Sequence, residues 1–284
     1  MNNPNDIVPQ KLTEEEKLEV EELVRPRAAM LYEVVRQEGE RELVRTAGAL
    51  WWSGIAAGLS LGLSVLVMAT LKTLVPEDSL GGALIAPLGY TVGFLIVVLA
   101  RQQLFTENTI TAVLPLMVDK TWINFYRTAR LWLIVLIANL IGTFTFTIFI
   151  AYSGGVSEEV LVAARGIASH MMDKSSTEMF FGAVVAGWLI ASMVWAVPSA
   201  EGMAFWVILL ITYVIALLEA SHIIAGSVEA YLLVLNGEVT AAYALRHFGL
   251  LTLMGNIVGG TTLFAMIAYV QVREEVNETR PSDH

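Results

Sequence analysis

The chain has 284 residues, of which 56% are hydrophobic and only 15% are charged, whereas a soluble domain carries about 25% charged residues. The absence of cysteine excludes disulfides, thiolate catalysis and cysteine-ligated metal sites. The formal net charge of −10 argues against nucleic-acid binding, which needs a basic surface. The composition therefore indicates an integral membrane protein embedded in a lipid bilayer.

Residues 1–47 form a charged segment before the first apolar stretch. The first residues are polar and acidic, without the basic and then apolar pattern of a signal peptide. Thr13 and Glu16 have the spacing of a helix-capping box, and Pro26 should interrupt the helix that follows. We expect a cytoplasmic arm of two amphipathic helical pieces at the membrane surface or against neighbouring subunits. A solvated charged arm is equally compatible with the pattern.

A membrane-spanning helix needs about 20 predominantly apolar residues. Six stretches of the sequence qualify, and they define a membrane domain over residues 48–271, followed by a tail at 272–284. The six are residues 48–71, 84–118, 128–152, 179–197, 204–235 and 248–271. The second and fifth are longer than the bilayer requires and carry polar residues near their middle, so each is predicted to be a broken helix.

The positions of the basic residues predict the orientation of the chain. Most of the 17 Lys and Arg residues fall on one side of the membrane if the N-terminus is inside. Cytoplasmic loops are enriched in Lys and Arg, so both termini are predicted to be cytoplasmic. The basic residues that would then lie outside are Lys72, Arg165, Lys174 and Arg246, and Arg101 would lie within a span.

The two halves of the sequence resemble each other. The segment around Asn139 is similar to the segment around Asn256, and nearly the same offset relates Thr106 in the first break to His222 in the second. Each half has three spans, so the second copy must be inverted and the two breaks should meet near the midplane. The pattern predicts an all-α membrane protein with six transmembrane helices in a three-plus-three inverted repeat. Small residues also serve ordinary helix packing, so a chance match stays open.

Three blocks of residues carry a resemblance to a known family. They are residues 100–109 (ARQQLFTENT), 221–227 (SHIIAGS) and 255–260 (GNIVGG). With these blocks the sequence resembles the formate/nitrite transporter family, most closely its YfdC-like branch of bacterial inner-membrane proteins. The resemblance implies a homopentamer of aquaporin-like protomers, each with its own pore for a small monovalent anion.

The resemblance also implies roles for five residues. Leu104, Phe105 and Thr106 would narrow the pore, and His222 would be its central histidine. Lys174, in the loop before the fourth span, is the nearest candidate for a lysine that attracts anions at the outer mouth. A plain solvated lysine is the alternative at that position, because several acidic residues lie nearby in the sequence.

The chain departs from the transporting members of the family beside the histidine. Ser221 stands where a glutamate is expected, and Gly226 and Gly187 stand where asparagines are expected. These groups normally hydrogen-bond the histidine. The resemblance therefore fixes neither the tautomer of His222 nor the substrate.

Elementary chemistry suggests what a central histidine does. A bare anion in hydrocarbon faces a prohibitive desolvation cost, which a weak acid avoids by crossing as the neutral molecule. Histidine titrates near physiological pH, so we hypothesise that His222 protonates the substrate. Apolar Leu104 and Phe105 would strip water from the ion, and Thr106 would replace part of its hydration. The alternative is a structural histidine hydrogen-bonded to a backbone carbonyl.

Four charged residues lie within or beside the two breaks. They are Arg101, Glu107, Glu219 and Glu229. A charge within the membrane is costly unless it is paired or faces water, so we expect Arg101 to pair with Glu107 or Glu219. Such a pair would either shape the electrostatics of the pore or staple the two breaks together.

The leading hypothesis is a channel or transporter for small monovalent anions or their conjugate weak acids. The alternative is a channel-fold protein with a closed or altered pore, which serves as a scaffold or sensor or passes a different small solute. An enzyme is disfavoured because the sequence has neither an HExxH zinc motif nor a GxSxG nucleophile elbow. We therefore expect no catalytic residue, no bound metal and no cofactor.

Overall fold

The computed structural model describes residues 13, 28–75, 80–200 and 202–278. Within these ranges the chain consists of helices and connecting segments, without a strand. The capping box expected from Thr13 to Glu16 and the interruption expected at Pro26 involve residues outside these ranges.

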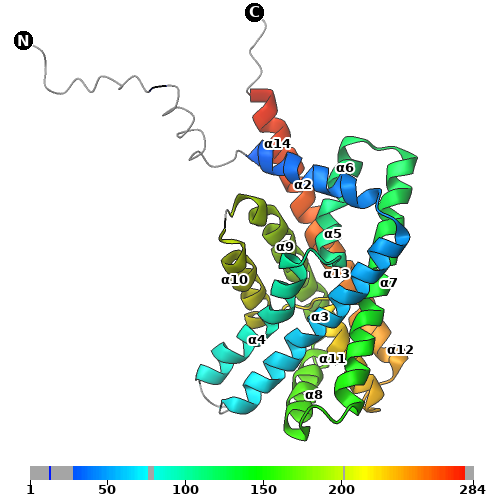
Figure 1. The fold of residues 1–284 in the computed structure, drawn as a ribbon, viewed down its shortest axis with the longest axis vertical. Helices are drawn as coiled ribbons and strands as arrows, with labels where there is room; N and C mark the ends of the chain where they lie inside the picture. Colours follow the sequence, from blue (N-terminus) through cyan, green and yellow to red (C-terminus); the bar gives the residue numbers. More distant parts are fainter. Residues whose placement is uncertain (1–12, 14–27, 76–79, 201, 279–284) are drawn as a thin grey trace, which may run out of the picture.

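Figure 1 shows the helices in chain order. They are α2 (Ala28–Leu43), α3 (Ala47–Leu74), α4 (Leu80–Leu99), α5 (Phe105–Thr111), α6 (Val113–Val118), α7 (Trp122–Tyr152), α8 (Glu158–Met172), α9 (Ser176–Ala196), η1 (Val197–Ser199), α10 (Ala204–Leu217), α11 (Ala225–Leu235), α12 (Ala241–Tyr243), η2 (Ala244–Leu250), α13 (Leu251–Ile257), η3 (Val258–Ala265) and α14 (Met266–Glu278). Four stretches of the described chain are long and apolar enough to cross a membrane: Ala47–Leu74, Trp122–Tyr152, Ser176–Ser199 and Ala241–Glu274.

The two longest apolar stretches of the sequence are interrupted in the structure. Residues 84–118 are divided between α4 and the shorter α5 and α6, and residues 204–235 are divided between α10 and α11. The short helix α5 packs against α9 and η3, whereas the short helix α11 packs against α7, α8 and α3. Each half of the chain therefore contributes a short helix to the other half.

Glycines bring the long helices close together. α3 packs along α7, and α9 packs along α13 and η3. A side chain at Gly58 would collide with the backbone of Asn139 and Gly142, and one at Gly187 would collide with the backbone of Asn256. The same device, a small residue at a helix crossing, thus operates in both halves of the chain.

The helix α2 packs onto the helices that follow it in the chain. It contacts α5, α6 and α14, and its side chains Tyr32, Val35 and Leu43 are buried. At Gly39 a Cβ atom would collide with the carbonyl oxygen of Thr111. This part of the N-terminal segment is therefore a packed helix rather than a solvated arm. α2 and α14 lie side by side at one end of the molecule (Figure 1).

Candidate functional site

The two interruptions have the same backbone turn. Arg101 and Glu219 both adopt left-handed conformations, with φ of 52° and 50°, in a region that usually favours glycine. In each turn two successive amides bond back to carbonyls of the helix that ends there, which is a Schellman motif. The bonds are Arg101 N to Val98 O (3.1 Å) and Gln102 N to Val97 O (2.9 Å), and Glu219 N to Ala216 O (3.0 Å) and Ala220 N to Ile215 O (2.9 Å). α4 and α10 thus end in equivalent ways.

A buried asparagine holds the extended segment after each turn. The Asn139 side chain donates to the carbonyls of Gln103 and Gly54 (both 2.8 Å) and accepts from the amide of Phe105 (2.9 Å). The Asn256 side chain makes the corresponding bonds: it donates to Ser221 O (3.0 Å) and Ala183 O (2.8 Å), and it accepts from Ile223 N (2.9 Å). Both asparagines are fully buried, so each satisfies three polar groups that water does not reach.

Thr106 and His222, one from each break, meet between the two turns. The Thr106 Oγ1 and His222 Nε2 atoms are 2.7 Å apart. Leu104 and Phe105 precede Thr106 and are equally buried, and His222 is only 2% exposed. The ring of Phe105 packs edge-on against Trp132 on α7, with ring centroids 5.8 Å apart.

The hydrogen bonds define the tautomer of His222. Nδ1 accepts a hydrogen bond from the backbone amide of Ala225 (3.2 Å), and a backbone N–H can only donate. The proton of the neutral ring is therefore on Nε2, which donates to Thr106 Oγ1. The partners of the ring are a hydroxyl and a backbone amide, not the backbone carbonyl of the structural alternative.

An aromatic ring that sequence analysis did not single out also contacts the histidine. Phe94 on α4 lies edge-on to His222, with ring centroids 5.1 Å apart. It is completely buried. Because Phe94 is one apolar residue in an apolar helix, the sequence carries no signal for this role.

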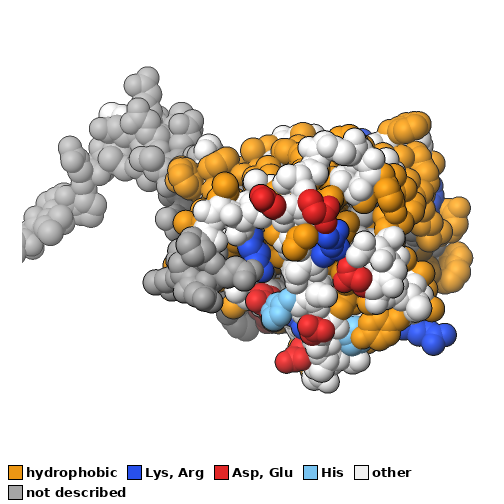
Figure 2. Space-filling model, turned by 90° about the horizontal axis from the view of Figure 1, so that it is seen from below, with side chains coloured by type: hydrophobic (Ala, Val, Ile, Leu, Met, Phe, Trp, Pro, Cys, Tyr) orange, Lys and Arg blue, Asp and Glu red, His pale blue; other side chains and the backbone are white. Residues whose placement is uncertain are grey.

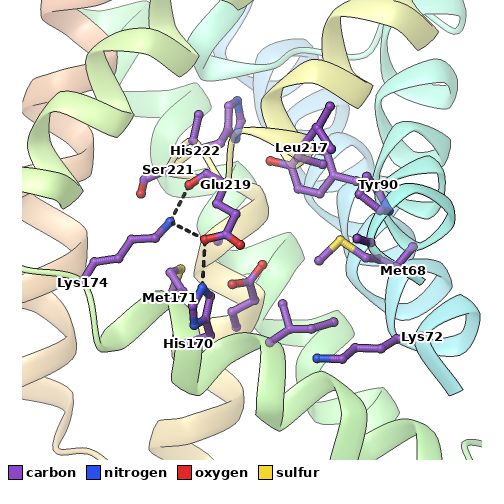
Figure 3. A pocket seen from close by; sticks show the side chains of 18 of the residues that line it. Met68, Lys72, Tyr90, His170, Met171, Lys174, Leu217, Glu219, Ser221 and His222 are labelled. Carbon is purple, nitrogen blue, oxygen red and sulfur yellow. Dashed lines mark hydrogen bonds and ion pairs between the residues drawn. The ribbon is translucent and has the colours of Figure 1, made fainter. Parts of the chain in front are cut away.

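A cavity of about 450 Å³ leads to His222. Its lining includes Lys174, Glu219, Ser221, His222 and Glu229. Figure 3 shows the residues that converge on it from α3, α4, α8 and the second break. At the end of the molecule where α3 ends and α4 begins, charged and histidine side chains gather in the middle of the face, with hydrophobic side chains along much of its edge (Figure 2).

The Glu219 carboxylate contacts two basic side chains of this cavity. It lies 2.9 Å from His170 Nε2 and 4.0 Å from Lys174 Nζ. The Lys174 ammonium also donates to the backbone carbonyl of Glu219, so that one residue holds both basic side chains (Figure 3). His247 Nε2 is 2.8 Å from the carbonyl oxygen of Lys174. Lys174 is therefore a half-buried residue of the cavity wall, with a side chain 18% exposed, and not a plain solvated lysine.

The expected pairing of Arg101 is wrong. Arg101 is exposed, and in the described part of the chain it makes an ion pair with neither Glu107 nor Glu219. The reason is that Glu219 is already held by His170 and Lys174, whereas Arg101 is solvated. The Oε1 atom of Glu107 is buried without a hydrogen-bond partner among the described residues.

The glutamines of the first break anchor it to neighbouring helices. Gln103 Nε2 donates to Glu42 on α2 (2.9 Å), and Gln102 Oε1 accepts from Ser60 on α3 (2.9 Å). Asn108 donates to Gln103 Oε1 (3.1 Å). The polarity of this break thus serves its attachment to α2 and α3. Among the described residues, no group of three or more His, Asp or Glu side chains is placed to hold a metal ion.

Comparison with known proteins gives the family. The family model for formate/nitrite transporters matches residues 29–270. The chain is 44% identical to the inner membrane protein YfdC of Escherichia coli (strain K12), over 94% of this chain and 86% of that protein. It is 24% identical to the formate channel BtFdhC of Bacillus thuringiensis, over 80% of this chain and 88% of that protein.

Solved structures share the fold. One is a pentameric formate channel with formate bound, with a TM-score of 0.69 and 18% identity over 80% of this chain and 98% of that one. Another is an ion channel of the same family, with a TM-score of 0.68 and 20% identity over 86% of this chain and 96% of that one. From the match over most of its length, the chain belongs to the formate/nitrite transporter family.

Proposed function

We propose that the protein is a transmembrane channel or transporter for small monovalent anions or their conjugate weak acids, of the formate or nitrite type. The names of its relatives support this substrate class. The observation that carries the proposal is the contact between Thr106 and His222 at the inner end of a cavity that several ionisable side chains line. The multi-pass membrane protein would lie in the bacterial inner membrane, as the name of the E. coli relative suggests.

The proposed architecture is a membrane domain over residues 48–271 with six spans, two of them broken, in a three-plus-three inverted repeat. The equivalent turns at Arg101 and Glu219 and the equivalent bonds of Asn139 and Asn256 support it. A cytoplasmic location of both termini agrees with α2 and α14 lying at one end. The pentameric assembly of a solved neighbour supports a homopentamer.

His222 is the central residue of the proposed pore. Its Nε2–H, which donates to Thr106 in this structure, becomes available to a substrate when the two side chains separate. In this tautomer the ring offers a hydrogen bond. Transfer of a proton from His222 to the substrate requires a second proton on Nδ1, which displaces the bond from Ala225 N–H. Leu104 and Phe105 exclude water on the side of the first break.

The test is uptake of formate, nitrite, acetate and chloride into liposomes that contain the purified full chain, measured by stopped flow at several pH values. His222→Ala should abolish uptake. His222→Gln keeps an N–H donor but carries no titratable proton, so loss of pH-dependent uptake in this variant supports protonation by His222, whereas retained pH dependence indicates another proton donor in the cavity. Wild-type flux at the level of empty liposomes for every anion would contradict the proposed function and favour a closed protein that acts as a scaffold or sensor.

A further inference from the structure

One buried carboxyl group in the cavity has no hydrogen-bond or ion-pair partner among the described residues. Glu229 lies on α11, two helical turns after His222, and is only 7% exposed. It lines the same cavity as His222. Throughout the described ranges, no hydrogen bond or ion pair reaches its carboxylate. Glu229 is therefore a buried carboxyl group in the lining of the space that a substrate would enter.

Two basic side chains of the cavity contact Glu219 rather than Glu229. Lys174 and His170 are both bound to Glu219, although the charges of Lys174 and Glu219 reach Glu229 through the cavity. The other ionisable side chains that face the space are Lys72 from α3 and Tyr90 from α4. Of the described lining residues, none comes from α7 or η2, which also pack against α11.

An unpartnered carboxylate within apolar protein is costly, so the group gains free energy by holding a proton or a cation. Much of the nearby lining is apolar, including Met68, Ala86, Pro87 and Met171. The neutral tautomer of His222 supplies a hydrogen bond but not a proton. A weak-acid anion therefore needs another proton source on its way to the constriction, and Glu229 stands at the position to supply it.

We propose that Glu229 is the proton-donating residue of the cavity and that it restricts passage to anions of weak acids. This inference rests on the proposed function. In the step, the O–H bond of the Glu229 carboxylic acid breaks and an O–H bond forms on the anion. Glu229 is left as a carboxylate, and the neutral acid moves on to Thr106 and His222. A proton from the bulk solution then reaches Glu229 through water in the cavity and restores its O–H bond.

The substrate class follows from the chemistry of this step. Anions such as formate, acetate and nitrite accept the proton and continue as neutral molecules. Chloride and nitrate do not accept it at ordinary pH, so they enter the constriction with their charge and its desolvation cost. When Glu229 has lost its proton, its negative charge repels them as well.

The experiment compares Glu229→Gln with the wild type in liposomes, using formate and nitrate between about pH 5 and pH 8. The substitution keeps the size of the side chain and removes the transferable proton and the negative charge. We expect the ratio of formate to nitrate uptake to fall about tenfold and the pH dependence of formate uptake to flatten. Glu159→Gln on the exposed start of α8 is the matched control and should resemble the wild type.

A wild-type ratio and pH profile in Glu229→Gln would overturn the inference and leave the proposed function intact. No anion flux in the wild type would instead overturn the proposed function, and this inference with it. Infrared difference spectra of the purified full chain give a readout that does not depend on flux. A carbonyl stretch of a protonated carboxylic acid that is present in the wild type and absent in Glu229→Gln supports the proposal, and its absence from the wild type at every pH overturns it.

Discussion

The two breaks have the same backbone but different side chains. Each begins with a left-handed residue, Arg101 or Glu219, and each is then held by a buried asparagine. The first break is tied to α2 and α3 through glutamines and carries apolar side chains into the constriction. The second break borders the charged cavity and carries His222.

The groups that hold the backbone of the two breaks differ from the side chains that meet at the constriction. Hydrogen bonds to the backbone do not depend on which side chains the turn presents, so the same turn can hold an apolar gate on one side and an imidazole on the other. The position of the Thr106–His222 contact is therefore set by groups that take no part in it, chiefly Asn139 and Asn256.

Replacing either asparagine should have the largest effect. Asn139→Leu and Asn256→Leu keep a similar side-chain volume but leave three buried backbone groups without partners. We expect each variant to lose about 3 kcal/mol or more of stability, measured as heat-induced aggregation in detergent. Asn236→Leu, at an exposed site after α11, is the control. A large loss in only one of the two variants would show that the breaks are not equivalent as scaffolds.

Thr106→Val removes the contact between the breaks while keeping the shape of the side chain. The Nε2–H of His222 then lacks its acceptor, and the substrate loses a hydroxyl at the constriction. We expect anion uptake into liposomes to fall about tenfold. Thr145→Val on the exposed face of α7 should leave uptake unchanged. Full uptake by Thr106→Val would mean that the hydroxyl does not serve the substrate.

Substituting glycine at the two left-handed positions should distinguish the effect of backbone strain on stability from the effect of side-chain contacts. Arg101→Gly relieves the positive φ without removing an ion pair to any described residue, so we expect stability to rise by up to about 1 kcal/mol. Glu219→Gly gains the same relief but loses the contacts to His170 and Lys174, so its stability should change little. Thermal aggregation of both variants checks this, and destabilisation by Arg101→Gly would reveal a contact of the arginine.

Some of these features could be predicted from the sequence, and others could not. Apolar stretches with polar interruptions and the recurring asparagine motifs are local patterns, and they predicted the breaks and the meeting of Thr106 with His222. The turns themselves were not predictable, because Arg101 and Glu219 occupy positions where the usual signal is glycine. The expected pair of Arg101 failed because opposite charges in two separate segments say nothing about their distance in space.

The smallest predicted effect concerns α2, which packs against α5 and α6 of the first break and against α14. Hydrogen bonds from Arg36 (2.6 and 2.7 Å) lower the pKa of Glu33 to about 2 from an ordinary value of 4.5. Because the pKa is lowered in the folded state, the contribution of this contact is complete above about pH 4.5 and is lost as the pH falls toward 2.

Hydrogen exchange of the α2 amides should therefore be independent of pH, after correction for intrinsic rates, from about pH 8 to pH 5, and protection should weaken only below that range. Arg36→Gln removes the contact at every pH and should abolish this acid-dependent loss, whereas Arg41→Gln at an exposed position of α2 should retain it. Loss of protection already near neutral pH would mean that other groups control the docking of α2, and the first break would then respond to pH through its attachment rather than through its pore side chains.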